Sequence, residues 1–303
     1  MGDRIDLHTH SNISDGSCNP KELIEVALKE NIKAIALTDH DNIGGIEEAY
    51  IAAREKNIDF LAGIEISSLY KNGRIIHILG LGIDLKNEEF LSAYNEMKMS
   101  RDKGVKDIIS KIKSQGIHIS IDDLRKKSKG EYLDRYDIYR YFLENKLCNS
   151  AQEIWDKYLD PIPYGDKELI KAEGAIRIIK EAGGLSFLAH YNKSIGFSGL
   201  SNEEIEEEIK YLISLGLDGI ERYYPSFNKV DYEFLDYLIE KYNLMISGGT
   251  DYHGKNRAEI EIGRGKSNNL FIPYDVYTKI NGVWNKDSED ECLTEIQFPV
   301  RKI

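Results

Sequence analysis

Cysteine is scarce in this 303-residue chain, and long apolar runs are missing. The three cysteines, Cys18, Cys148 and Cys292, are odd in number, lie far apart and include no Cys-x-x-Cys pair. This usage argues against a disulfide framework and favours a reducing compartment, so we expect a cytoplasmic protein. Because no apolar stretch is long enough to cross a bilayer or to act as a signal segment, we expect neither membrane insertion nor export.

Positive charge is also in deficit, because 40 lysines and arginines stand against 52 aspartates and glutamates, giving a formal net charge of −12. This balance argues against binding of long nucleic acids or anionic membranes through the general surface. It does not exclude a small anionic substrate, since divalent cations held in a pocket reverse the local sign of the field. No pattern in the sequence points to a protein partner.

Short apolar segments alternate with longer amphipathic ones, which is typical of a βα series with a parallel sheet or barrel. The alternation stops over about residues 88–163, where the pattern predicts helices and no strand. We therefore expect a barrel in two parts, residues 1–90 and 166–270, a helical insert over 91–165, and a tail over 271–303 that docks as irregular structure or frays. The expected strands are Arg4–Leu7, Ala34–Leu37, Phe60–Gly63, Ile75–Leu81, Leu185–Ala189, Asp218–Ile220 and Met245–Gly248.

Local signals mark where several helices begin. Asn19 can cap a helix that has Pro20 at its first position, and Glu22 completes a capping box. A helix is expected from about Lys167 to Glu181, and Lys98–Ser114 is expected to be the main helix of the insert. These boundaries follow from capping residues and apolar spacing alone.

Six of the seven histidines fall within short acidic-histidine signatures at the ends of the expected strands. His8 and His10 lie two apart, so both imidazoles face one side of an extended segment. Glu65 follows an apolar strand, where an isolated carboxylate is costly to bury unless a cation offsets its charge. Functional groups gather at the C-terminal ends of barrel strands, so we expect a shared site for divalent metal ions. The candidate ligands are His8, His10, Asp15, His40, Glu65, His77, His190, Asp251 and His253.

Each of these residues has a simpler interpretation when it is taken alone. A single histidine after a strand is most often structural, Asp15 can be a turn residue, and Asp39 can orient a liganding histidine without binding metal itself. The joint pattern weakens these alternatives, because nine such residues with this spacing would all have to be coincidence. Neutral imidazoles with three carboxylates favour manganese, iron or zinc over calcium.

These motifs, in their order along the chain, resemble those of the PHP (polymerase and histidinol phosphatase) family over about residues 3–265. They are His8-Thr-His10, Ser14-Asp15-Gly16, Thr38-Asp39-His40, Gly63-Ile64-Glu65, His77, Ala189-His190 and Asp251-Tyr-His253-Gly254. The resemblance implies a distorted seven-stranded (β/α)7 barrel that holds a centre of two or three Mn, Fe or Zn ions.

The resemblance also implies how the ligands are divided. The first ion would be held by His8, His10, Glu65 and Asp251, the second by Glu65 as a bridge with His77 and His190, and the third by Asp15, His40 and His253. As catalytic residues we expect Asp15, His40, Glu65, Asp251 and His253.

Residues and resemblance together predict a phosphoesterase that hydrolyses a phosphomonoester, of a nucleotide or another small phosphorylated metabolite, by a metal-bound hydroxide. The alternatives are a 5′–3′ exonuclease on short oligonucleotides, a histidinol-phosphate-type phosphatase and a metal-binding regulatory module without turnover. For the substrate, we expect the insert residues Arg101 and Arg135 to bind phosphate through their guanidinium groups. Lys193 and Glu221, which follow expected strands, are the other candidate substrate-binding residues.

Overall fold

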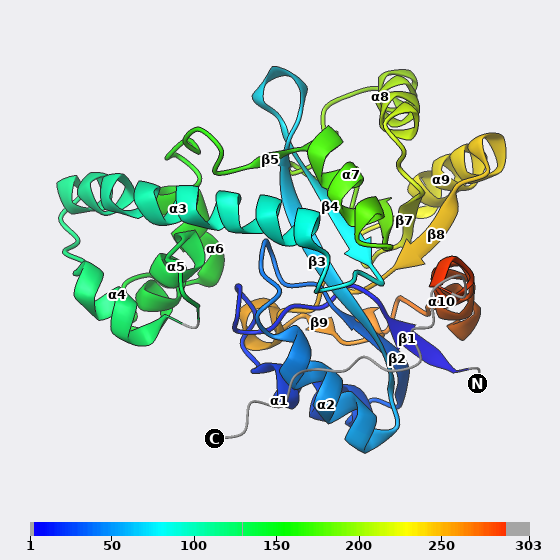
Figure 1. Cartoon of the computed structure of the whole chain (residues 1–303), viewed down its shortest axis with the longest axis horizontal. Helices are drawn as coiled ribbons and strands as arrows, with labels where there is room; N and C mark the ends of the chain where they lie inside the picture. Colours follow the sequence, from blue (N-terminus) through cyan, green and yellow to red (C-terminus); the bar gives the residue numbers. More distant parts are fainter. Residues whose placement is uncertain (1–2, 129, 289–303) are drawn as a thin grey trace.

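The computed structural model describes residues 3–128 and 130–288, and its centre is a sheet of eight strands (Figure 1). Seven strands follow one another in the order β1-β2-β3-β4-β6-β7-β8, and the short β5 (Ile170–Lys171) pairs with β3. Most neighbours are parallel, which confirms the α/β class predicted from the alternating pattern. The strands of the path are β1 (Arg4–Asp6), β2 (Ile32–Leu37), β3 (Asp59–Leu69), β4 (Ile75–Leu81), β6 (Leu185–Leu188), β7 (Gly219–Tyr223) and β8 (Met245–Gly248).

Strand β4 is the exception, because it pairs antiparallel with both β3 and β6. β3 and β4 form a hairpin whose tip is the 3-10 turn η1 (Lys71–Gly73). The parallel direction expected for this strand is therefore wrong, although its predicted bounds are right. The reversal matters for the site, because His77 in the first half of β4 lies beside Ala189, just past the C-terminal end of β6.

The two ends of the strand path approach each other. Leu7 N donates to Gly248 O over 3.1 Å, His10 N donates to Tyr252 O over 2.9 Å, and Thr9 forms an isolated parallel bridge with Tyr252. No ladder joins β1 to β8 within the described residues, so the closed seven-stranded barrel stays a prediction.

Helices cover the sheet because each buries an apolar stripe against it. Leu23 and Ile24 of α1 and Ala49 of α2 pack with β2, and Ile176 and Ile179 of α7 pack with β3 and β4. Asn19 caps α1 in a full capping box, as predicted. The bounds of these helices are α1 (Pro20–Lys29), α2 (Ile46–Lys56), α7 (Ala172–Glu181), α8 (Asn202–Ser214) and α9 (Lys229–Tyr242). The expected helix over Lys167–Glu181 begins five residues later than predicted because β5 intervenes.

The segment after β8 ends in a helix. Following the 3-10 turn η3 (Gly254–Arg257) and the hairpin β9 (Ile260–Glu261) and β10 (Gly265–Lys266), the chain enters α10 (Tyr274–Ser288). Three buried side chains of α10 pack into the core beneath β1 and β2, namely Val276, Tyr277 and Ile280. The irregular tail expected from residue 271 is thus wrong over α10, because one apolar stripe is enough to dock it. Cys292 lies outside the described residues.

The chain between β4 and β5 forms a helical layer at one side of the sheet (Figure 1). Its long helix α3 (Glu88–Ser114) is capped by Asn87 and begins ten residues before the predicted start at Lys98. The layer has a hydrophobic core of its own, to which Ile112 of α3 and Phe142 of α5 contribute. Its other elements are α4 (Ile121–Lys127), α5 (Arg135–Glu144), α6 (Ala151–Ile154) and the π-helical turn η2 (Trp155–Leu159). No helix of the described chain is long and apolar enough to cross a membrane.

Candidate metal centre

The nine candidate ligands converge at one edge of the sheet. They come from the ends of β1, β2, β6 and β8, from the middle of β3, from the first half of β4 and from adjoining loops, and none is more than 6% exposed. Asp251 and His190 adopt left-handed backbone conformations, with φ values of 55° and 24°. Such conformations cost about 1–3 kcal/mol at residues other than glycine, and they cluster at functional sites.

Glu65 lies at the centre of this group, and both of its carboxylate oxygens face imidazoles. Oε2 is 3.0 Å from His40 Nδ1, 3.1 Å from His8 Nε2 and 3.2 Å from His10 Nε2. Oε1 is 2.6 Å from His77 Nδ1 and 2.9 Å from His190 Nε2. One carboxylate therefore touches five ring nitrogens from four segments of the chain.

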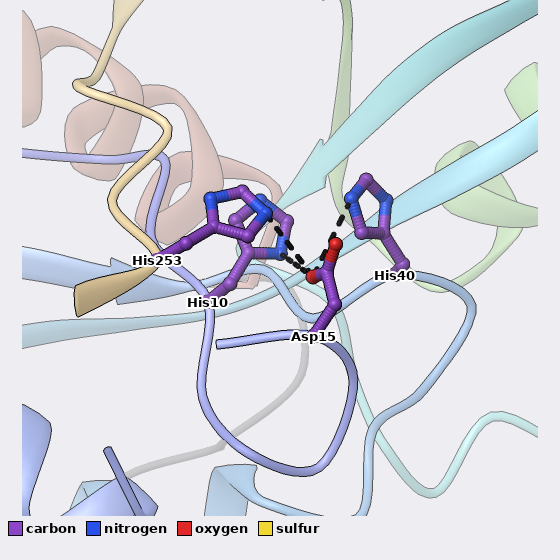
Figure 2. Close-up of side chains that lie close together, drawn as sticks. All are labelled: His10, Asp15, His40 and His253. Atoms are coloured by element: carbon purple, nitrogen blue, oxygen red, sulfur yellow. Dashed lines mark ion pairs between the residues drawn. The ribbon is translucent and has the colours of Figure 1, made fainter. Parts of the chain in front are cut away.

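Asp15 is the centre of a second group, and Figure 2 shows three imidazoles around it. Its Oδ1 is 3.1 Å from His253 Nε2, 3.8 Å from His40 Nε2 and 4.0 Å from His10 Nδ1. His10 and His40 each turn one ring nitrogen to Asp15 and the other to Glu65. These two histidines thus connect the two carboxylates.

The ligand atoms gather into three sets that differ in part from those implied by the family resemblance. One set contains the four residues assigned to the first ion. A second adds His10 to the residues assigned to the third ion, and a third combines Glu65 and His77 with His40. The three sets are His8, His10, Glu65 and Asp251; His10, Asp15, His40 and His253; and His40, Glu65 and His77. His190 is not in a set but reaches Glu65 Oε1 directly.

The chemistry of these side chains fits divalent cations. Several buried atoms that face the centre have no hydrogen-bond partner among residues 3–128 and 130–288, including His8 Nε2, both ring nitrogens of His10, His253 Nε2 and Glu65 Oε2. Burying unpaired polar atoms costs about 1–3 kcal/mol each, and coordination of a cation removes this cost. Imidazole nitrogen combined with carboxylate oxygen suits first-row transition metals and zinc.

Electrostatics in the centre favour positive charge. Burial opposes ionisation of Glu65, but His40 and His77 outweigh this effect and hold its pKa well below its usual range. Burial likewise opposes the charging of His40, yet Glu65 and Asp15 raise its pKa to about 9. Burial lowers the pKa of His253 to about 4, which keeps this imidazole in the neutral form that binds metal. Cations bound here would take the place of the protons that the carboxylates attract.

Two buried acids, Glu221 and Asp6, hold the ligands from the side away from the cavity. Glu221 Oε1 lies 2.8 Å from His8 Nδ1, and its Oε2 accepts a hydrogen bond from the backbone N–H of His190. Asp6 accepts from the backbone N–H and the hydroxyl of Thr250, next to Asp251. Glu221 is fully buried, so it orients a histidine and does not reach substrate as the sequence had suggested. The sequence pattern did not single out Asp6, because its partner lies more than 240 residues away.

Arg101 and Arg135 do not lie where the sequence interpretation required. Arg101 Nη1 is 2.9 Å from Asp41 Oδ2, and its Nε donates to Glu168 O over 2.7 Å. Arg135 donates to Leu159 O over 2.6 Å. Both guanidinium groups are buried, and neither is among the described residues that line the cavity over the centre. Arg101 joins the insert to the loop after β2, and Arg135 holds the end of the insert together through Leu159 O and Pro163 O. These contacts correct the expectation that the two arginines contact phosphate.

A cavity of about 1100 Å³ lies over the centre, between the sheet edge and the insert. Lys193 lines it, as the sequence suggested, and its Nζ is 3.1 Å from Asp251 Oδ2. The sequence reasoning missed Arg257, whose Nη1 is 2.6 Å from the same oxygen, and Tyr224 donates to that oxygen over 2.8 Å. Arg257 stands in the turn η3, and only its position six residues after Asp251 could have indicated a role.

Comparison with known proteins agrees with the fold and the geometry. The PHP domain family model matches residues 6–170, more than half of the chain. The chain belongs to the PHP family. A relative from Haemophilus influenzae named 5′-3′ exoribonuclease is 32% identical to this PHP protein, over 84% of the chain and 91% of the relative. A 3′,5′-nucleoside bisphosphate phosphatase of Chromobacterium violaceum is 29% identical, over 86% and 90%.

A solved structure from Bifidobacterium adolescentis superimposes on the PHP protein with a TM-score of 0.77 and 23% identity, covering 93% of this chain and 96% of the other. At this identity the likeness supports the fold alone. Family membership with the named relatives confirms the predicted class, a hydrolase that acts on phosphoric ester bonds.

Proposed function

We propose that this PHP protein hydrolyses a phosphomonoester of a nucleotide or of another small phosphorylated compound, in a centre that binds two or three ions of manganese, iron or zinc. The observation that carries the proposal is the ring of buried, unpartnered nitrogen and oxygen atoms around Glu65, directly beneath a cavity. Bound divalent ions supply Lewis-acid catalysis, because they neutralise charge on phosphoryl oxygens and make water more acidic.

The chain's own residues divide into groups that hold cations and groups that hold substrate. Asp251 belongs to both, because its Oδ1 is 3.2 Å from His10 Nε2 while its Oδ2 contacts Lys193 and Arg257. Lys193 and Arg257 are about one-third exposed in the cavity, which leaves them free to turn from Asp251 toward a phosphoryl oxygen. In this role they bind and orient the phosphate and stabilise charge that develops on it.

Replacing Lys193 or Arg257 by alanine should raise KM for a phosphorylated substrate about tenfold. The loss of one hydrogen bond to a charged group is worth about 1.5–3 kcal/mol, and partial exposure reduces that value here. Steady-state kinetics with elemental analysis of each variant measure the effect. Arg222→Ala is the matched control, because this arginine pairs with Asp236 and is not among the described residues of the cavity lining. Unchanged KM in both the Lys193 and the Arg257 variant would show that these two side chains do not bind the substrate.

The cavity wall supplied by the insert is aromatic and suits a nucleotide base. Tyr136, Trp155 and Tyr164 line it, and the ring of Tyr136 stacks on His40 with centroids 5.6 Å apart. Bases bind to such surfaces by stacking, with little dependence on sequence. The cavity lining therefore fits a nucleotide whose phosphate lies at the metal centre and whose base lies against the aromatic residues of the insert.

A second candidate function is the 5′–3′ exonuclease activity for which one relative is named. The cavity volume of about 1100 Å³ lies just above the range of about 300–1000 Å³ that is typical of small-molecule sites. Arg74 and Lys266 line the cavity in addition to the cations at Asp251, so several backbone phosphates would find positive charge. The net charge of −12 restricts this activity to short strands.

A substrate series with the Mn²⁺-loaded protein tests the proposal. We expect phosphate release from nucleoside monophosphates or bisphosphates, measured beside histidinol phosphate and 5′-phosphorylated oligoribonucleotides of two to ten nucleotides. Release of mononucleotides from the oligomers, at kcat/KM above that for the small phosphates, would favour the exonuclease. No turnover of any of these compounds, by a protein whose metal load is verified, would contradict both activities.

A further inference from the structure

One face of helix α5 lies against the loop that carries Asp15. Tyr139 and Arg140 follow Tyr136 by three and four residues, so both lie on the same face of the helix as Tyr136. Tyr136 stacks on His40 with a ring angle of 7°, and the hydroxyl of Tyr139 lies 3.4 Å from Asp15 O. The insert therefore touches the Asp15 group of candidate ligands directly, through a helix that carries none of them.

Arg140 makes the closest of these contacts. Its Nη1 donates to Ile13 O over 2.8 Å and to Ser14 O over 2.9 Å, and lies 3.4 Å from Asn12 O. Its Nη2 is held by Asp137 Oδ1 at 2.6 Å. One guanidinium group thus gathers three consecutive carbonyl oxygens just before Asp15, and its own position is fixed by a neighbour on the same helix.

The other side of the same loop is held by the sheet. Asp39, at the end of β2, accepts hydrogen bonds from the hydroxyls of Ser11 and Ser14 over 2.6 Å each. The loop is tightly folded, since a Cβ atom on Gly16 would stand 2.4 Å from His10 O. Asp39 alone does not fix Asp15, because its contacts end at Ser14. Two further elements restrain the loop: η3, where Asn256 Nδ2 donates to Asp15 O over 2.7 Å, and the insert, where Arg140 binds the three carbonyls before Asp15.

We propose that Arg140 is a positioning residue for the cation site formed by His10, Asp15, His40 and His253. Asp15 is the one carboxylate of this set, and the three imidazoles alone hold a divalent ion poorly unless that carboxylate stays in place. The inference rests on the proposed function, because it assumes that the set binds a cation. It gives the insert a part in the metal centre in addition to its part in the cavity wall.

Mn²⁺ binding to the full-length chain, measured by calorimetry and by elemental analysis after gel filtration, tests this role. Arg140→Ala should weaken the Mn²⁺ site that Asp15→Asn removes about 10–100-fold, the range found when groups that orient metal ligands are removed. Arg140→Lys should recover part of the affinity, because one ammonium group can still reach one or two of the carbonyls. Asp15→Asn serves as the reference that removes the ligand itself.

Arg125→Ala is the matched control. Arg125 is also an insert arginine that donates to a backbone carbonyl, Glu131 O, and pairs with a carboxylate, Asp102, but these contacts lie within the insert. Its replacement should leave Mn²⁺ affinity unchanged. Thermal unfolding of the metal-free variants separates positioning from general stabilisation.

Suppose that Asp15→Asn loses one ion, but Arg140→Ala lowers the unfolding temperature and keeps wild-type Mn²⁺ affinity at every site. That result would overturn the positioning role of Arg140 and leave the proposed cation site intact. If Asp15→Asn also retains every ion, the Asp15 cation site of the proposed function fails, and this inference fails with it. If Arg140→Ala does not fold, wild-type Mn²⁺ affinity in Arg140→Lys, measured with the same controls, overturns the inference.

Discussion

Glu65→Gln is expected to lower kcat/KM by more than about 100-fold and to reduce the number of bound metal ions. Substitutions of groups that merely orient ligands cost about 10–100-fold, and the loss should be larger for Glu65 because it would hold the cations directly. Its two oxygens face five imidazole nitrogens, and glutamine removes the negative charge and replaces one of these oxygens by an NH₂ group that cannot bind a cation. Activity and metal content should therefore fall together.

Elemental analysis and steady-state kinetics on the same preparation measure the two quantities. The matched control is Glu168→Gln, because Glu168 is also buried but belongs to the contact between the insert and the sheet. This variant should keep its metal ions and its activity per folded chain. Full occupancy and wild-type activity in Glu65→Gln would contradict the bridging role proposed for Glu65.

Removal of metal by a chelator should abolish hydrolysis and destabilise the fold. Without cations, the buried carboxylates and imidazoles of the centre lose the partners that offset their burial. A ligand present at a thousand times its Kd stabilises the native state by about 4 kcal/mol, so each ion of the centre should contribute on this scale. Thermal unfolding and phosphate release before and after dialysis against EDTA measure the two effects.

Addition of Mn²⁺ or Zn²⁺ after the chelator is removed should restore both stability and activity. Ca²⁺ should restore neither, since it prefers six to eight oxygen ligands and the centre presents mainly imidazole nitrogen. Activity that survives with less than one metal ion per chain would show that hydrolysis does not depend on the centre.

The sequence predicted the positions of the candidate ligands well, because strand ends and residue type are local signals. His8 and His10 follow β1, His190 follows β6, and Asp251 follows β8, as the apolar pattern indicated. The bounds of β4 and β8 were also right, since β-branched and apolar runs mark them. In each case the strand and the ligand after it could be predicted because the signal lies in a few neighbouring residues.

Features that depend on distant contacts were not predictable in this way. The antiparallel direction of β4 follows from its pairing with β3 and β6, which leaves no mark on its own alternation. Arg101 and Arg135 have the charge of phosphate-binding residues, yet Asp41 and backbone carbonyls of the insert take their donors. Arg257 reaches the cavity only because η3 folds back toward Asp251.

The central claim is that nine residues from distant segments form one centre for two or three divalent cations. A crystal structure of the Zn²⁺-loaded protein, with anomalous diffraction measured at the zinc edge, tests it most directly. The account predicts two or three peaks around Glu65 and Asp15, each about 2.0–2.2 Å from imidazole nitrogen and carboxylate oxygen. No anomalous peak within this group of side chains, in crystals grown with excess zinc, would contradict it.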